Sequence, residues 1–234
     1  MSIYRIADLY IDIEPYYEYT YRQLLPYTAD TQSAKADITV RLTKKLLLDE
    51  AKYAPGLPEP YYESIAIYRQ ICFSVLKSFN GLFFHCSALA VNNEAYIFTA
   101  QSGTGKSTHA RMWRETFGDS VVMINDDKPL IRLIDDVFYV YGTPWDGKHS
   151  LSSNIKVPLK AICFLKRGEQ NVISQVNGTD WLSFVLNQTI VPKDTQSMNN
   201  LLNMLEKMLT EVKTYELRCN ISHEAAKVAY EFMK

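Results

Sequence analysis

Apolar residues at even spacing mark the start of the chain and predict a lobe that contains strands. Residues 3–13 place apolar side chains mostly two positions apart, as in a half-buried strand. A second, shorter run of this kind covers 36–42. The proline-broken segment 54–60 then interrupts the pattern. We therefore expect a small N-terminal α+β lobe over residues 1–60.

The spacing changes to that of an amphipathic helix after this segment. Apolar side chains fall on one helical face from Tyr61 to Phe79, and Asn80-Gly81 tolerates the left-handed backbone that ends a helix. Two strand-like runs follow at 82–91 and 94–99. They are separated by Asn92-Asn93, a pair suited to the positive φ angles of a tight hairpin turn. The helix therefore delivers the chain into a sheet.

Helices and strands continue to the end of the chain. An apolar stripe of Ala110, Trp113 and Phe117 predicts a helix that ends at Gly118, and the apolar run 121–124 predicts a buried strand. Further strands are predicted at 130–133, 137–141, 157–165, 172–175 and 215–219, and further helices at 181–188, 197–212 and 224–233. We expect a single α/β domain over 61–234.

Composition and charge narrow the classes of function. A formal net charge of -1 gives no electrostatic footprint for nucleic acid, so we expect no nucleic-acid partner. The amino terminus lacks a basic stretch followed by an apolar one, and no later apolar run is long enough to span a bilayer. We therefore expect a cytoplasmic protein with no membrane partner. The four cysteines are scattered, which favours reduced core thiols over disulfides or a metal site.

The segment 100–108 carries the strongest functional signal. It fits the phosphate-loop pattern A-x-x-x-x-G-K-S, with a strand predicted before it and a helix after it. Glycines in such a loop let backbone N–H groups approach phosphate oxygens. Lys106 would reach the β- and γ-phosphates of ATP, and the Ser107 hydroxyl would ligate Mg²⁺. The residues predicted to bind the nucleotide are Ser102, Gly103, Thr104, Gly105, Lys106, Ser107 and Thr108.

Two adjacent carboxylates follow the next predicted strand. Asp126 and Asp127 come directly after 121–125, which would place them beside the bound phosphates at the carboxyl edge of the sheet. One carboxylate suits Mg²⁺, and the other could take the proton from an attacking hydroxyl. A solvated turn before Pro129 is the alternative interpretation.

His85 lies on the apolar run that precedes the hairpin, so it could approach the same edge of the sheet. From the residues alone, a lone histidine among Phe83, Phe84 and Cys86 is better explained as a hydrogen-bonded core residue.

The order FFHCSALAVNNEAYIFTA, QSGTGKST and VVMINDD resembles the catalytic domain of HPr kinase/phosphorylase and the related phosphoenolpyruvate carboxykinase-like ATP fold. The resemblance covers about 82–127, and more loosely the chain to Leu165. It implies an α/β fold with a phosphate-loop nucleotide-binding domain of this type beside the N-terminal α+β lobe. It also implies a catalytic site of Lys106, His85 and the two aspartates. Asp127 would be the proton acceptor and Asp126 the magnesium-side residue, although these two roles can be exchanged.

The segment 142–154 looks like a counterpart found in small HPr kinase-like proteins associated with peptide natural-product gene clusters, some of which phosphorylate serine in a precursor peptide. Its Lys148 and His149 are candidate acceptor-side residues, although a surface loop anchored by Trp145 fits equally well. Arg167 is a third candidate, because arginine at a strand end can stabilise charge on a transferring phosphoryl group. A solvated turn before Gly168 is its alternative.

Two classes of function fit these residues. The first is an ATP- and Mg²⁺-dependent kinase that acts on a serine hydroxyl of a peptide, protein or small molecule, alone or as a homo-oligomer. The second is a nucleotide-binding regulatory or maturation-accessory protein without productive transfer. The second carboxylate favours the kinase, because binding alone needs no proton acceptor.

Overall fold

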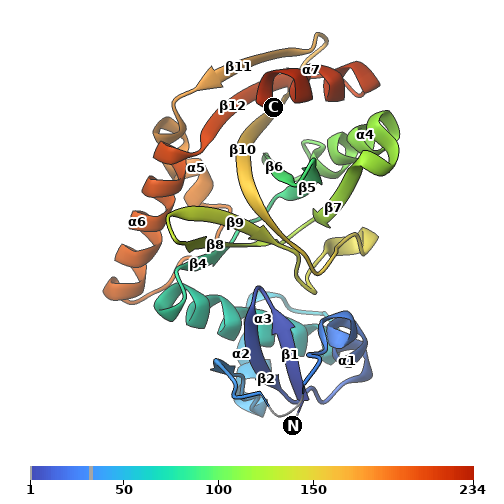
Figure 1. Ribbon diagram of the computed structural model, residues 1–234. Helices are drawn as coiled ribbons and strands as arrows, with labels where there is room; N and C mark the ends of the chain where they lie inside the picture. The colour runs from blue at the N-terminus through green and yellow to red at the C-terminus, as the bar shows by residue number, and fades with distance from the viewer. Residues whose placement is uncertain (1, 32–33) are drawn as a thin grey trace.

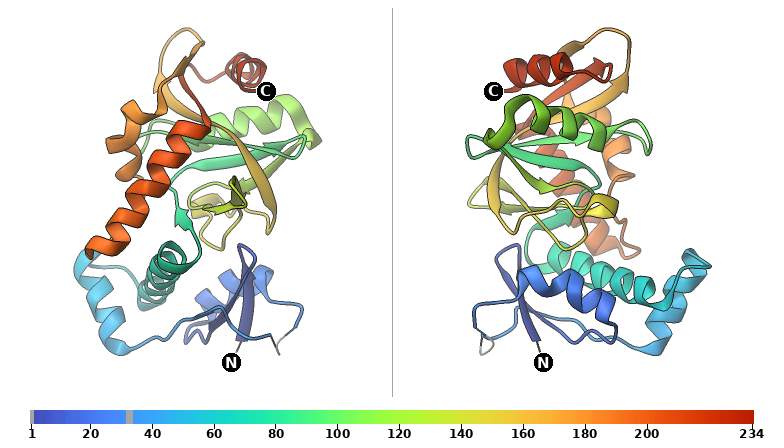
Figure 2. Two further views of the ribbon diagram at one scale, coloured as in Figure 1. Left: turned by 60° about the vertical axis from the view of Figure 1, so that its left-hand side comes forward. Right: turned by 90° about the vertical axis from the view of Figure 1, so that its right-hand side faces the viewer.

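The structure is a computed structural model that describes residues 2–31 and 34–234, and it has two lobes (Figure 1). The small lobe, drawn in blue, holds a small sheet with α1 (Glu18–Leu24) and α2 (Lys44–Tyr53). The larger lobe holds a curled mixed sheet with helices on both faces (Figure 2). The chain therefore has a mixed α/β fold.

The first strand prediction is wrong in one respect. Residues 3–13 form a hairpin of β1 (Ser2–Ile6) and β2 (Leu9–Ile13), not one strand. The turn is made by Ala7 and Asp8, whose φ angles are 54° and 61°. Apolar side chains continue at even spacing through such a two-residue turn, so the hydrophobic pattern does not reveal it. The strand expected at 36–42 shortens to β3 (Ile38–Thr39), which pairs parallel with β2.

Helix α3 (Glu59–Ser78) confirms the amphipathic pattern and joins the lobes. Its buried residues Ile67, Ile71 and Val75 share one hydrophobic cluster with the small-lobe strands and with Phe83, Leu130 and Tyr141 of the larger sheet. The domain boundary after residue 60 stays a prediction. In the structure, α3 contributes to the core on both sides of it.

Apart from the run 82–91, which divides into two strands, the strands of the larger sheet agree closely with those expected. They are β4 (Gly81–Phe83), β5 (Ser87–Val91), β6 (Glu94–Thr99), β7 (Val121–Asn125), β8 (Leu130–Ile134), β9 (Val137–Tyr141), β10 (Lys156–Arg167), β11 (Val172–Val176) and β12 (Lys213–Cys219). Their order is β4-β8-β9-β10-β6-β5-β7, with β12 and then β11 branching from β10. The hairpin turn between β5 and β6 has the positive φ angles expected of Asn92 and Asn93, 52° and 62°.

Helices bury alternate residues of the sheet strands. Ile162 and Phe164 of β10 pack in a cluster with α5 (Leu182–Leu186) and α6 (Thr195–Glu211). The intervening Cys163 and Leu165 pack in a second cluster with α4 (Lys106–Phe117) and α7 (His223–Met233). This alternation follows from the period of two in a strand. The free thiols Cys72, Cys86 and Cys163 are buried, as expected.

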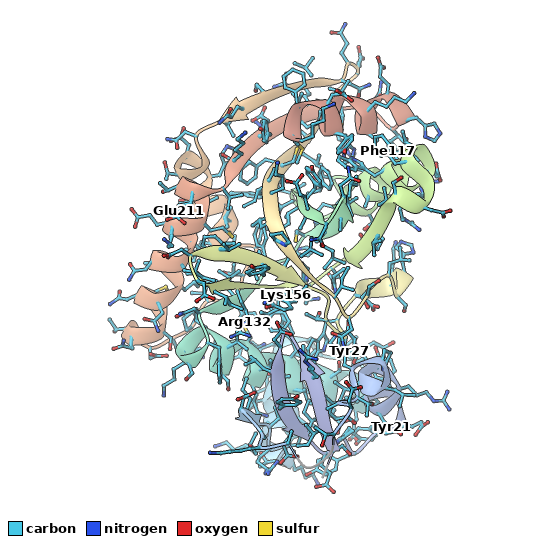
Figure 3. All side chains as sticks on the ribbon, viewed as in Figure 1. Tyr21, Tyr27, Phe117, Arg132, Lys156 and Glu211 are labelled. Carbon is cyan, nitrogen blue, oxygen red and sulfur yellow. The ribbon has the colours of Figure 1, made fainter. Side chains whose placement is uncertain are left out.

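Polar contacts fix the lobes against each other. Arg132 on β8 donates a 2.7 Å hydrogen bond from Nη1 to the Ala7 carbonyl, and Lys156 Nζ lies 3.3 Å from Asp8 Oδ2. Figure 3 labels Arg132 and Lys156 at this junction. The Tyr141 hydroxyl also donates to Asp8, at 3.0 Å. Over the described ranges 2–31 and 34–234, the structure contains no helix with the length and apolarity needed to cross a membrane.

Candidate active site

A loop of residues 100–105, here called the glycine loop, links β6 to α4. Gly103 and Gly105 have φ angles of 78° and 123°, a backbone region that residues with a Cβ rarely adopt. The strand, loop and helix therefore follow one another as the sequence predicted. Ser107 and Thr108 lie half-buried in the first turn of α4, where backbone N–H groups have no partner within the helix.

Lys106 begins α4 and is only 8% exposed. Its ammonium donates a hydrogen bond to the Ala100 carbonyl, with an Nζ to O distance of 3.2 Å. Burial lowers the pKa of Lys106, and the nearby charges of Asp127 and Asp126 oppose that shift. A buried cation beside exposed backbone donors attracts an anion more strongly than a solvated one would.

A buried asparagine holds the two aspartates in a turn at the end of β7. Asn125 Oδ1 accepts hydrogen bonds from the backbone N–H groups of Asp127 and Lys128, at 2.8 and 2.7 Å. Its own amide donates to the Thr143 carbonyl at 3.0 Å. The backbone of this turn is therefore fixed as in an Asx turn.

Asp126 and Asp127 have different surroundings. Asp126 is 7% exposed, and its Oδ1 accepts a 2.5 Å hydrogen bond from the buried Ser87 hydroxyl. Sequence reasoning missed Ser87. The sequence feature that could have identified Ser87 is its position two residues after His85, because alternate residues of an extended segment share a face. Asp127 is more open, and its side chain is 23% exposed.

His85 meets Asp127 from a break in the sheet. The prediction of a single strand over 82–91 is wrong, because residues 84–86 lie between β4 and β5 and bond to other segments. Their backbone N–H groups donate to the backbone carbonyls of Pro129, Gln188 and Asp127, respectively. Across this break, His85 Nε2 lies 3.4 Å from Asp127 Oδ1.

The other side of the His85 ring contacts an amide. Its Nδ1 lies 3.1 Å from Gln188 Oε1. Burial and then the charge of Lys106 lower the pKa of His85, and the charge of Asp127 opposes that shift. No pattern in the sequence marks Gln188, which lies far along the chain. The structure thus brings His85, Lys106, Asp126 and Asp127 together.

Lys128 adds an ion pair to this cluster. Its Nζ lies 2.5 Å from Asp127 Oδ2, so both oxygens of that carboxylate face a nitrogen. The same ammonium lies 5.8 Å from the centre of the Tyr68 ring. The side chain is thereby held beside the carboxylate.

The candidate acceptor-side residues separate into two places. Lys148 lies in the same cleft lining as Asp127, and exposed His149 is in the same short turn, Gly147–His149. A Cβ on Gly147 would come within 3.0 Å of Asp127 Cβ, so this turn abuts the aspartate. Arg167 lies elsewhere and donates to the glycine loop, at 2.5 Å to the Gly103 carbonyl and 3.3 Å to that of Thr104.

Oxygen atoms that could ligate a magnesium ion are present at the site. Among the described residues, no group of three or more His, Cys, Asp or Glu side chains is arranged to hold a metal. Mg²⁺ in nucleotide sites is typically held by one or two protein oxygens together with phosphates and water. Ser107 and Asp126 fit that smaller requirement.

Comparison with known proteins gave likenesses to solved structures alone. No family model and no curated protein matches the chain. Among solved structures, the chain is similar to the Hpr(Ser) kinase/phosphatase from Coxiella burnetii, with a TM-score of 0.35 and 8% sequence identity. The match covers 64% of this chain and 95% of that one. A likeness this weak carries no inference about activity.

Proposed function

We propose that this protein is an ATP- and Mg²⁺-dependent kinase of HPr kinase-like fold that transfers the γ-phosphoryl group to a serine hydroxyl. The observation that carries the proposal is the meeting of His85, Lys106, Asp126 and Asp127 beside the glycine loop. These residues come from three separate segments of the chain. A structural core would have little use for four ionisable groups at one half-buried place.

The nucleotide would bind at the glycine loop and the start of α4. Backbone N–H groups there would contact phosphate oxygens, and Lys106 would face the β- and γ-phosphates. Ser107 and Asp126 would hold Mg²⁺, with the Ser87 hydrogen bond orienting the Asp126 carboxylate. The metal ion supplies neutralisation of charge on the β- and γ-phosphates. Arg167 would steady the loop through its two carbonyl contacts.

Asp127 is better placed than Asp126 to accept the proton of the acceptor. It lines the open cleft and is the less buried of the two, whereas Asp126 is tied to Ser87. The Asp127 carboxylate would take the proton as the serine oxygen bonds to the γ-phosphorus and the bond to the β-phosphate oxygen breaks, releasing ADP. His85 would assist by orienting Asp127.

One observation favours the alternative, a nucleotide-binding regulatory or maturation-accessory protein without transfer. The ion pair between Lys128 and Asp127 occupies the oxygen that would otherwise receive the proton. In the kinase, Lys128 must move toward the phosphates or the acceptor when these bind. In a regulatory protein, the pair would stay closed.

Phosphate transfer decides between the two. The protein is incubated with MgATP and a pool of serine peptides, and products are followed by mass spectrometry. The kinase predicts a mass gain of one phosphate on serine, lost in Asp127→Asn while ATP affinity is retained. Tight, saturable ATP binding by the wild-type protein without any transfer would support the alternative. Absence of ATP binding would remove both.

A further inference from the structure

A cleft of about 1110 Å³ separates helices α1 and α3 from the segment 142–154. Asp127 and Lys128 belong to its lining, so it opens directly onto the proposed base. Arg167 does not belong to this lining and contacts the glycine loop instead. The inference that follows rests on the proposed function, and concerns what occupies this cleft.

A hydrogen-bond chain between the lobes builds the cleft. Gln23 on α1 donates to the Pro144 carbonyl at 3.0 Å, and its side-chain oxygen accepts from the Ser64 hydroxyl at 2.6 Å. Ser64 on α3 in turn accepts from the Trp145 indole at 3.1 Å. Because the chain joins both walls, the shape of the cleft is preformed rather than left to movement of the lobes.

Two tyrosines on the small-lobe wall stack but remain open to solvent. The rings of Tyr19 on α1 and Tyr61 on α3 have centroids 4.8 Å apart at an angle of 26°. They are still 41% and 43% exposed. Rigid aromatic side chains of this kind are enriched among residues that dominate binding energies, since they bury a large area and lose little side-chain entropy.

The charges of the lining balance. It contains three basic side chains and three acidic ones, namely Arg22, Lys128, Lys148, Glu18, Asp127 and Asp146. Arg22 already pairs with Glu18, at 2.8 Å. A lining with equal numbers of basic and acidic side chains does not favour a phosphoryl acceptor of one charge. Contacts with the aromatic rings must therefore supply most of the selectivity among acceptors.

The place of Asp127 in the lining of a cleft with two walls limits the shape of the acceptor. A serine hydroxyl stands one carbon away from its backbone, so the backbone must enter the cleft for the oxygen to reach Asp127. The walls on both sides exclude a broad folded surface. Pockets of about 300–1,000 Å³ typically hold drug-sized ligands, and this cleft, at about 1110 Å³, is larger still. A free amino acid would therefore leave most of its volume unfilled.

We propose that the cleft between the lobes is the acceptor site, and that it takes an extended peptide segment carrying the serine. Tyr19 and Tyr61 are then specificity-determining residues supplied by the small lobe. The peptide packs on the tyrosine pair and presents its serine to Asp127. The small lobe is thereby part of the kinase and not an appendage.

The test begins from binding, so that it does not depend on transfer. Ten-residue peptides with one central serine and random flanks are selected from a display library on the wild-type protein. Their dissociation constants are then measured with wild type, Tyr19→Ala, Tyr61→Ala and the control Tyr21→Ala. Tyr21 lies on the same helix as Tyr19, is 44% exposed, and is outside the cleft lining (labelled in Figure 3).

We expect Tyr19→Ala and Tyr61→Ala to weaken binding about tenfold or more, and Tyr21→Ala to leave it unchanged. With MgATP, the same two variants should raise the peptide KM with little change in kcat or ATP affinity. Equal losses in all three variants, or faster use of free serine or of a folded serine-bearing domain, would overturn the proposal. Peptides that bind through Tyr19 and Tyr61 but are never phosphorylated would uphold the peptide cleft and reject the kinase.

Discussion

Replacement of Lys106 by methionine tests whether this lysine binds a ligand or only stabilises the fold. The ammonium is buried, has a hydrogen bond of 3.2 Å to the Ala100 carbonyl, and has a pKa lowered by burial. A neutral side chain of similar length removes the cost of burying that charge. We therefore expect Lys106→Met to change the unfolding free energy of the nucleotide-free protein by no more than about 1 kcal/mol, in the stabilising direction.

With nucleotide bound, the variant should instead be much less stable than the wild-type protein. At an ATP concentration of one hundred times Kd, binding stabilises the wild-type protein by about 2.7 kcal/mol. For a chain of this size, that raises the melting temperature by roughly 5–10 °C. Lys106→Met should show almost no such rise, because the charge that faces the phosphates is gone. The measurement is thermal unfolding of both proteins with and without MgATP.

Two results would refute this reasoning. An equal rise with MgATP in both proteins would mean that Lys106 does not face the phosphates. A large loss of stability in the nucleotide-free variant would mean that Lys106 is chiefly a counter-ion for Asp126 and Asp127. Lys160→Met is a matched control, because Lys160 pairs with Glu94 at 2.8 Å away from the glycine loop.

Four further predictions concern other residues of the site and its support. Asp127→Asn should lower kcat about 10²-fold or more in the phosphate-transfer assay, with ATP affinity within twofold of wild type. Gly147→Ala should lower turnover without loss of ATP binding, because a Cβ there meets Asp127 at 3.0 Å and the φ angle of 73° disfavours alanine; wild-type turnover would contradict it. Arg167→Ala should weaken ATP affinity more than it raises the acceptor KM, since Arg167 holds the glycine loop; isothermal titration measures the first. Burial lowers the pKa of His109 to about 3, so as the pH falls from 7.5 to 5 the unfolded chain binds a proton that the folded protein does not. The free energy of unfolding, measured with urea, should therefore fall by about 2 kcal/mol over that range, and His109→Gln should remove this loss.

Local patterns in the sequence predicted most elements of the larger lobe. Strand β6, helix α4 and strand β7 follow from clear apolar spacing and from the glycines at their ends. The hairpin at Ala7 and Asp8 could not be predicted in this way, because Ala7 is not a typical turn residue and the apolar pattern runs through the turn. The spacing of apolar residues indicates which side chains are buried, and the strands on both sides of a tight turn bury side chains in the same alternating pattern.

The site was predictable where its residues adjoin in sequence, and not where the fold joins distant segments. Lys106 and the two aspartates follow recognisable local patterns. Gln188 reaches His85 across 103 positions of the chain. The tyrosine pair of Tyr19 and Tyr61 likewise depends on how α1 packs against α3. Contacts of this kind arise from tertiary packing, on which the spacing of residues within one element has no bearing.

The length of strand β10 lets its two ends contact distant parts of the molecule. It is 12 residues long, which corresponds to roughly 40 Å when extended. Its first residue, Lys156, pairs with Asp8 of the small lobe, and its last, Arg167, holds the glycine loop. Hydrogen bonds to β9, β6 and β12 brace it along its length. Strand β10 therefore connects the lobe junction with the glycine loop through one continuous stretch of backbone.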